Sequence, residues 1–207
     1  MPQPYQGLWS ADIDSLSKRP ELAMHIGIII GMWANVDLAM ARLLSEMLHI
    51  SASRGTAMYV AIENDGARKA SMRAAAKECL PEDLQKEFES LLVSLKTPAA
   101  QRNKMAHGIW GIPRDDIPIL VWSDSRAAAK FSASLTYSSA IGLQNLKAHD
   151  WKGVEATMVE YQSGALSYGE KDFEAIEANV KRAILRIYIF IQKVRESRGS
   201  LASQGVH

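Results

Sequence analysis

The sequence predicts an all-α fold, an up-and-down bundle of four long helices with a small β-strand-containing insertion before the last helix. Apolar residues recur at intervals of three and four over long stretches, which is the period of an amphipathic helix. Between residues 109 and 166 this pattern gives way to turn residues and short alternating or β-branched stretches, which favour strands. The 207 residues are 47% hydrophobic, so length and composition allow one domain with a substantial core.

The first 19 residues are expected to form a peripheral N-terminal arm with a short helix from Ala11. The first part of the bundle, residues 20–108, starts at Pro20-Glu21, because proline suits the first helical position and an acid there complements the helix dipole. The first helix is expected to reach about Ile50. Its apolar stripe contains Leu22, Ile26, Ile29, Trp33, Val36, Met40, Leu43 and Met47, and further apolar residues widen it, so contacts on more than one side are expected.

Two further helical regions complete this part of the bundle. The second region runs from about Ser53 to Cys79, with a break near Asn64-Asp65-Gly66. The third starts at Pro81 and keeps its apolar phase as far as Gly108, a natural helix end. Within it, Thr97-Pro98 is expected to restart or kink the helix, because proline lacks the backbone N–H.

The insertion, residues 109–166, is expected to pack on a helical frame that survives without it. Strands are predicted at Ile117–Trp122, Lys130–Tyr137 and Glu155–Tyr161, and the second of these alternates cleanly between apolar and polar residues. The stretch Ser139–His149 is ambiguous and compatible with a short helix.

The final bundle helix is expected over residues 167–198. Its apolar stripe has no gap, and charged residues occupy the other side. The small and polar tail, residues 199–207, is expected to fray.

Charge and cysteine content exclude several classes of protein. The 24 Lys and Arg against 23 Asp and Glu give a net charge of +1, which argues against binding of nucleic acid by bulk charge. The single cysteine, Cys79, excludes an internal disulfide and a four-cysteine zinc site. The N-terminus lacks the apolar core of a signal peptide, and the longest apolar run, Ile26–Ala34, is short for a membrane span. We therefore expect a soluble, cytoplasmic protein. His25, His49 and His149 lack partners at ligand spacing and no phosphate-binding loop is present, so neither a metal ion nor a cofactor is expected.

The most informative segment lies at the end of the third helical region. It reads Gln-Arg-Asn-Lys-Met-Ala-His-Gly from Gln101 to Gly108, so an Arg-Asn pair precedes a His-Gly pair by three residues. This pattern resembles the signature of HEPN domains, a family of helical bundles with an arginine, a polar residue, a short spacer and a histidine near the end of the third main helix. Arg102, Asn103 and His107 match that signature. The segment Gly31–Leu38 is similar to the family's first helix, with its aromatic and then acidic residue.

The resemblance implies a metal-independent RNA endonuclease that acts as a homodimer with two signatures facing one cleft. A histidine titrates near neutral pH and serves as a general base or acid, while arginine offers a charged planar fork to phosphate oxygens. Arg102 and His107 are the expected catalytic residues, and Asn103 would orient one of them or contact the ribose. The resemblance is also compatible with a toxin or phage-defence component that has an antitoxin protein as partner.

One geometric difficulty leaves a second interpretation open. Five residues along an ideal helix correspond to about 140° of rotation, so Arg102 and His107 do not share a face. They converge only if the helix frays at Gly108 or if a second subunit completes the site. In the alternative, the protein is a non-catalytic HEPN-like binding or scaffold module. Arg102 is then a buried ion-pair partner, with Asp37 as the supporting residue, and His107 caps the helix dipole.

A row of cations is the candidate surface for an RNA backbone. Lys69, Arg73 and Lys77 follow one another at intervals of four, which stacks them on one helix face. Rows of this kind are more often a solvated helix face, and that is the favoured interpretation here.

Overall fold

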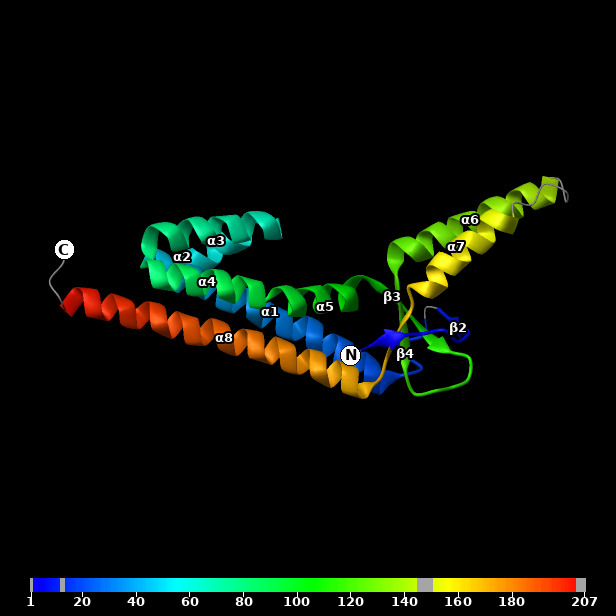
Figure 1. The fold of residues 1–207 in the computed structure, drawn as a ribbon, viewed down its shortest axis with the longest axis horizontal. Helices are drawn as coiled ribbons and strands as arrows, with labels where there is room; N and C mark the ends of the chain where they lie inside the picture. Colours follow the sequence, from blue (N-terminus) through cyan, green and yellow to red (C-terminus); the bar gives the residue numbers. More distant parts are fainter. Residues whose placement is uncertain (1, 12–13, 145–150, 204–207) are drawn as a thin grey trace. The chain divides into compact units, whose positions relative to one another are not determined.

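The computed structural model describes residues 2–11, 14–144 and 151–203 (Figure 1). These residues are mostly helical and include a small antiparallel sheet, as the sequence predicts. The elements in chain order are β1 (Gln3–Pro4), β2 (Trp9–Ser10), α1 (Pro20–Leu48), α2 (Ala52–Ala61), α3 (Asp65–Cys79), α4 (Glu82–Ser94), α5 (Lys96–His107), β3 (Gly108–Pro113), β4 (Leu120–Asp124), α6 (Ser125–Gln144), α7 (Trp151–Ser163), β5 (Leu166–Tyr168) and α8 (Glu170–Ser203).

The helix boundaries up to residue 107 follow the sequence signals closely. α1 begins at Pro20, and the break near Asn64 is real, because the Asn64 side chain accepts a hydrogen bond from Ala67 N and caps α3. The third region divides at Leu95, two residues before the expected restart at Thr97-Pro98. Pro98 therefore sits in the first turn of α5, where a missing N–H costs little.

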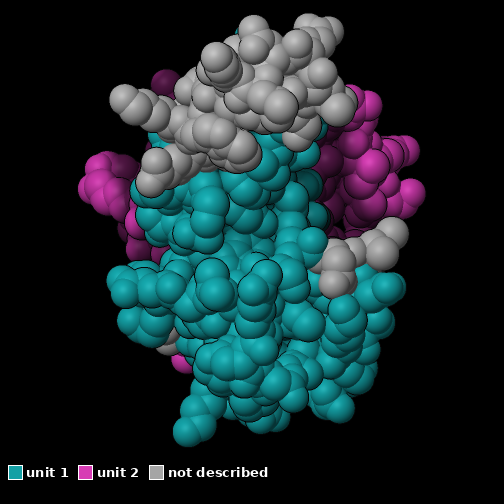
Figure 2. Space-filling model, turned by 90° about the vertical axis from the view of Figure 1, so that its right-hand side faces the viewer, with its two compact units in different colours: residues 1–30, 101–177 teal, residues 31–100, 178–207 magenta. Residues whose placement is uncertain are grey.

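The described residues form two compact units, coloured separately in Figure 2. Unit 1 consists of residues 1–30 and 101–177 and contains the sheet. Unit 2 consists of residues 31–100 and 178–207 and is helical. α1 and α8 each supply residues to both units, and each unit has its own hydrophobic core.

The sheet of unit 1 has the strand order β1-β5-β4-β3-β2, and adjacent strands run antiparallel. The N-terminal arm is part of this sheet, which corrects the expectation of a peripheral arm with a helix from Ala11: β1 pairs with β5, and β2 pairs with β3. Trp9 lies over Gly111 of β3, where a Cβ would lie 2.4 Å from the Trp9 ring, so only glycine allows this approach. Residues 12 and 13 lie outside the described residues.

Two of the three predicted strands are wrong. Lys130–Tyr137 lies in α6 and Glu155–Tyr161 lies in α7, which Figure 1 shows side by side as a helical hairpin. The Asp124 carboxylate caps α6 by accepting a hydrogen bond from Arg126 N, 2.8 Å long. Phe131 of α6 then stacks on Tyr161 of α7 with ring centroids 5.3 Å apart. The part of Ser139–His149 beyond Gln144 lies outside the described residues, and the predicted strand Ile117–Trp122 corresponds to β4.

The core of unit 1 joins helices and sheet. Strands β3 and β4 of the insertion contribute Trp110, Leu120 and Trp122 to this core. Tyr168 of β5 packs against Trp110, and burial raises its pKa to about 12. The remaining buried members are Leu22, Ile26, Ile29, Met105, Phe173 and Ile176.

The α6–α7 hairpin, in contrast, is expected to be dispensable for folding. No described member of the unit 1 core lies between Ser125 and Ser163, and the pairing of Trp122 with Leu166 places the two ends of the hairpin close together. We therefore expect a variant with residues 125–163 replaced by a short turn to keep a cooperative unfolding transition, measured by tryptophan fluorescence in urea. A broad, non-cooperative transition in this variant would show that the hairpin holds the sheet together.

Unit 2 packs α2, α3 and α4 with the adjoining parts of α1 and α8. Its largest fully buried side chains include Phe88 of α4 and Phe190 of α8, whose ring centroids lie 6.0 Å apart. At its surface, Glu46 is paired with Arg195 and Arg198, and these cations lower the pKa of the Glu46 carboxyl. α8 continues to Ser203, beyond the expected frayed tail from residue 199, and residues 204–207 lie outside the described residues.

α1 is the one helix in the described ranges whose length and composition would suit a membrane span. An 18-residue window within it has a mean hydropathy of 1.5, with 28% of that window buried. The uninterrupted apolar run Ile26–Ala34 is shorter than this window. α1 also supplies buried residues to both cores, as a core helix does; Ile29 and Leu43 are fully buried examples.

Candidate functional site

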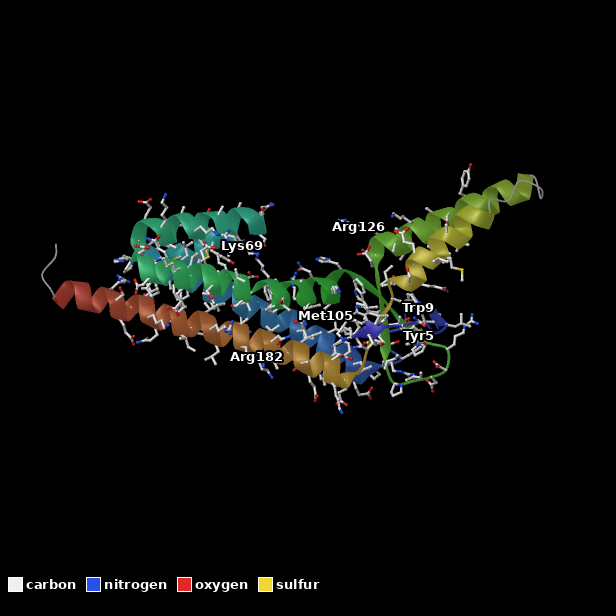
Figure 3. The ribbon with its side chains drawn as sticks, in the orientation of Figure 1. Tyr5, Trp9, Lys69, Met105, Arg126 and Arg182 are labelled. Atoms are coloured by element: carbon white, nitrogen blue, oxygen red, sulfur yellow. The ribbon has the colours of Figure 1, made fainter. Side chains whose placement is uncertain are left out.

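The end of α5 is held by two tryptophans from the sheet. The last carbonyls of a helix have no partner within it. Here Trp122 Nε1 donates to Lys104 O at 2.8 Å, and Trp110 Nε1 donates to Met105 O at 3.4 Å. Met105 itself is 2% exposed and belongs to the unit 1 core; Figure 3 labels it on α5. The signature segment therefore lies on a helix end that is anchored on both its backbone and its apolar side.

Gly108 joins α5 to β3 without an intervening loop. A Cβ at this position would lie 1.5 Å from Trp122 Nε1, which no rotamer change of a neighbour in a packed core can accommodate. The helix end at Gly108 is confirmed, and the physical reason is the indole ring that lies against the glycine.

The structure connects Arg102 with the exposed face that carries His107. Arg102 Nη1 donates a hydrogen bond to Asn103 Oδ1 at 3.1 Å. Asn103 and His107 are four residues apart in a continuous helix, so they lie on the same face, and both are exposed. Asn103 thus turns the guanidinium toward the face of His107, although α5 stays helical through His107 and does not fray before Gly108.

Arg102 and His107 differ in their surroundings. Arg102 is half-buried, and its Nε atom is buried without a hydrogen-bond partner among the described residues. His107 is exposed, and its ring makes no hydrogen bond within the described part of the chain. The histidine is therefore open to solvent, whereas the Nε side of the arginine is buried and its Nη1 is bonded to Asn103.

Lys104 adds a cation beside these residues that the sequence reasoning did not single out. Its ammonium lies over the Trp122 ring, 5.2 Å from the centroid, which orders the side chain through a cation–π contact. The only sequence signal was its position inside the signature segment, between Asn103 and His107.

Asp37, expected as the supporting residue of Arg102, lies on α1 within unit 2. Its carboxylate accepts a hydrogen bond from the Tyr59 hydroxyl at 3.3 Å and lies 3.9 Å from Arg68 Nη1. Burial, together with the nearby Asp37 charge, raises the pKa of Tyr59. The three side chains tie α1, α2 and α3 together, beside a cavity of about 250 Å³.

The cationic row on α3 is largely engaged by carboxylates. Lys69, labelled in Figure 3, pairs with Asp65 at 2.6 Å, and Arg73 pairs with Glu89 at 2.7 Å. Lys77 has no ion pair within the described ranges. Because two of the three charges are compensated, the row has the character of a solvated helix face.

Comparison with protein families, with curated proteins and with solved structures finds no match to this chain. The HEPN resemblance therefore rests on the sequence alone: on the signature segment, on the first helix and on the late amphipathic helix from Phe173. Among the residues that the structure describes, no three His, Cys, Asp or Glu side chains are grouped so as to hold a metal ion.

Proposed function

We propose that the protein is a HEPN-like, metal-independent RNA endonuclease, with Arg102 and His107 as catalytic residues and Asn103 as their assistant. One observation carries this proposal: the 3.1 Å hydrogen bond from Arg102 to Asn103, on the helix face that also presents exposed His107. Arg102 and His107 point to different faces of an ideal helix, but the bond holds the Arg102 guanidinium beside Asn103, which shares a face with His107. It gives the arginine, the asparagine and the histidine a common polar surface at the end of α5.

The chemistry proceeds through the RNA's own 2′-hydroxyl. The 2′ oxygen attacks the phosphorus, the bond from phosphorus to the 5′ oxygen breaks, and a 2′,3′-cyclic phosphate forms. One proton leaves the 2′ oxygen and another is delivered to the departing 5′ oxygen, and His107 suits either transfer. The Arg102 guanidinium stabilises the extra negative charge on the non-bridging oxygens. Because one chain offers one such histidine, the second proton-transfer group is His107 of the partner subunit in a homodimer.

This proposal makes a direct test available. Cleavage of a single-stranded RNA should persist in excess chelator, because Arg102 supplies the positive charge that a metal ion would otherwise provide. Cleavage should disappear when the 2′-hydroxyl at the scissile position is replaced by hydrogen, because that oxygen is the nucleophile. The measurement is gel analysis of a labelled oligonucleotide. Activity that depends on a divalent metal, or that cuts the deoxy-substituted position, would contradict the mechanism.

A homodimer is the proposed assembly, and the exposed face of α1 supports it. Met24 is 58% exposed, Ile28 38% and Leu38 55%, which is a large apolar exposure for one helix. We expect light scattering at micromolar concentration to give the mass of a dimer and the Ile28→Asp variant to shift the mass toward the monomer. The exposed Val93→Asp change on α4 serves as the control and should leave the mass unchanged. A strict monomer in the wild type would contradict the assembly and the shared cleft.

The alternative function is a non-catalytic HEPN-like binding or scaffold role. The half-burial of Arg102, three residues before fully packed Met105, favours it, because a structural arginine would have these surroundings. The exposure of His107 favours the enzyme, since a histidine with a packing role would be covered. A HEPN-type four-helix frame, a cytoplasmic location and an antitoxin partner belong to the same proposal.

A further inference from the structure

A small cavity of unit 2 is bordered by arginines and hydroxyl groups. It has a volume of about 170 Å³ and lies between the α4–α5 junction and the middle of α8. Buried Pro98 and Ala183 line it, and the short Ala183 side chain leaves the space open. The hydroxyl-bearing residues Ser94 and Thr97 also line it.

Two arginines of α8 border the same cavity. Arg182 and Arg186 are four residues apart, so they lie on the same face of the helix; Figure 3 labels Arg182. Arg182 donates a hydrogen bond to Asn179 Oδ1, which also belongs to the lining and orients the guanidinium. Arg186 has no hydrogen bond or ion pair to any described residue. The cavity is therefore bordered by two guanidinium groups, of which Arg182 is oriented by a neutral amide and Arg186 makes no hydrogen bond or ion pair to any described residue.

No carboxylate balances these charges from the two chain segments that form the walls. The sequence has no Asp or Glu between Glu89 and Asp115, and none between Glu177 and Glu196. Glu87 borders a neighbouring cavity that shares Ser94 and Arg186, but its carboxylate is paired with Lys193. An anion that enters the cavity of about 170 Å³ would thus meet two guanidinium groups, and no carboxylate in the lining would compete with it.

We propose that this cavity binds a phosphate group, either inorganic phosphate or the terminal phosphate of a small phosphate monoester. Two arginine forks match the oxygens of a tetrahedral oxyanion, and charge-assisted hydrogen bonds are about twice as strong as hydrogen bonds between neutral groups. The Thr97 hydroxyl provides a further donor. The volume suits a phosphate group and the first atoms that bear it, and is small for a whole nucleotide. The site is in unit 2 and is independent of the ribonuclease proposal.

The test titrates the full-length protein with inorganic phosphate, with adenosine 5′-monophosphate and with adenosine, using isothermal titration calorimetry at low ionic strength. The variants are Arg182→Gln, Arg186→Gln and the double variant, which remove charge at exposed positions. Lys181→Gln is the matched control, because it removes the same charge one residue away on the same helix. A thermal melt of each variant checks that it is folded. Thr97→Val is a further variant that tests the cavity without a change of charge.

We expect both phosphate-bearing probes to bind at one site and adenosine not to bind. Each arginine change should weaken binding about tenfold, equivalent to about 1.4 kcal/mol, the double variant should abolish it, and Lys181→Gln should leave it within about twofold. Tighter binding of the monophosphate than of phosphate identifies a monoester as the ligand, and the reverse identifies the free ion. Wild-type protein that binds neither probe, or an equal loss in Lys181→Gln, would overturn the proposal.

Discussion

Replacement of His107 by alanine is expected to lower the rate of RNA cleavage by about 10²- to 10⁴-fold, the usual contribution of a general acid or base. The same change should leave the thermal unfolding midpoint within about 1 °C, because His107 is exposed and its ring makes no hydrogen bond in the described part of the chain. The measurement is single-turnover cleavage of a labelled RNA beside a thermal melt of the same preparation. Activity and stability are then separated in one variant.

Arg102→Ala should lose a comparable amount of activity, about 3 kcal/mol of transition-state stabilisation. Arg102→Lys is the informative companion, because it keeps the charge but loses the planar fork that bonds Asn103 and that, in the proposed mechanism, would also bind phosphate. We expect the lysine variant to recover only a small part of the loss. Asn103→Ala should give an intermediate loss, since it frees the guanidinium without removing it.

The control for the activity measurements is a cation far from the signature segment in the sequence. Lys86→Ala removes an exposed cation of α4 that is paired with Glu82, and should leave cleavage unchanged. A wild-type protein that is inert on every RNA tried, combined with a sharply destabilised His107→Ala variant, would mean that the histidine is structural. The non-catalytic alternative would then stand.

Phe173→Ala is expected to have the largest effect on stability, a loss of about 3–5 kcal/mol of unfolding free energy. Phe173 is fully buried and contacts three rings: His25 stacks on it at 5.7 Å, Tyr168 lies at 5.5 Å and Trp110 at 6.0 Å. Its loss leaves a cavity at the point where α8 meets the sheet of unit 1. Urea unfolding followed by tryptophan fluorescence measures the change.

The control for this prediction is Tyr137→Ala on α6. Tyr137 is 63% exposed, so removal of its ring should change the unfolding free energy by no more than about 0.5 kcal/mol. A Phe173→Ala variant as stable as the wild type would show that the aromatic cluster relaxes to fill the space, contrary to the packing described above.

Local sequence signals were enough to place most helices, because capping and period are properties of consecutive residues. Pro20 starts α1 and Asn64 caps α3, as predicted. Part of α6 was wrongly predicted as a strand because Phe131 and Leu135 are four residues apart, a spacing that fits both an alternating strand and a helix. The deciding signals were the cap at Asp124 and the alanines that follow it, which favour a helix.

The sheet and the site's supporting contacts could not be predicted from local pattern. The strands of the N-terminal arm are two residues long and find their partners far along the chain, so no periodicity marks them. At the candidate site, the residue types and the helix end at Gly108 were predictable. The indole of Trp122 against Gly108 and the pairing of Asp37 with Tyr59 were not, because they depend on tertiary packing.

The pairing of β1 with β5 sets an order of events for a nascent chain. Gln3 is synthesised 164 positions before its strand partner Ser167. At translation rates of about 5–20 residues per second, this edge of the sheet waits roughly 8–33 s for its partner. During that interval the apolar residues of the arm and of early α1 have no completed core to enter. The yield of folded protein should therefore depend on chaperone capture and on the rate of translation of the second half, in addition to the stability of the finished fold.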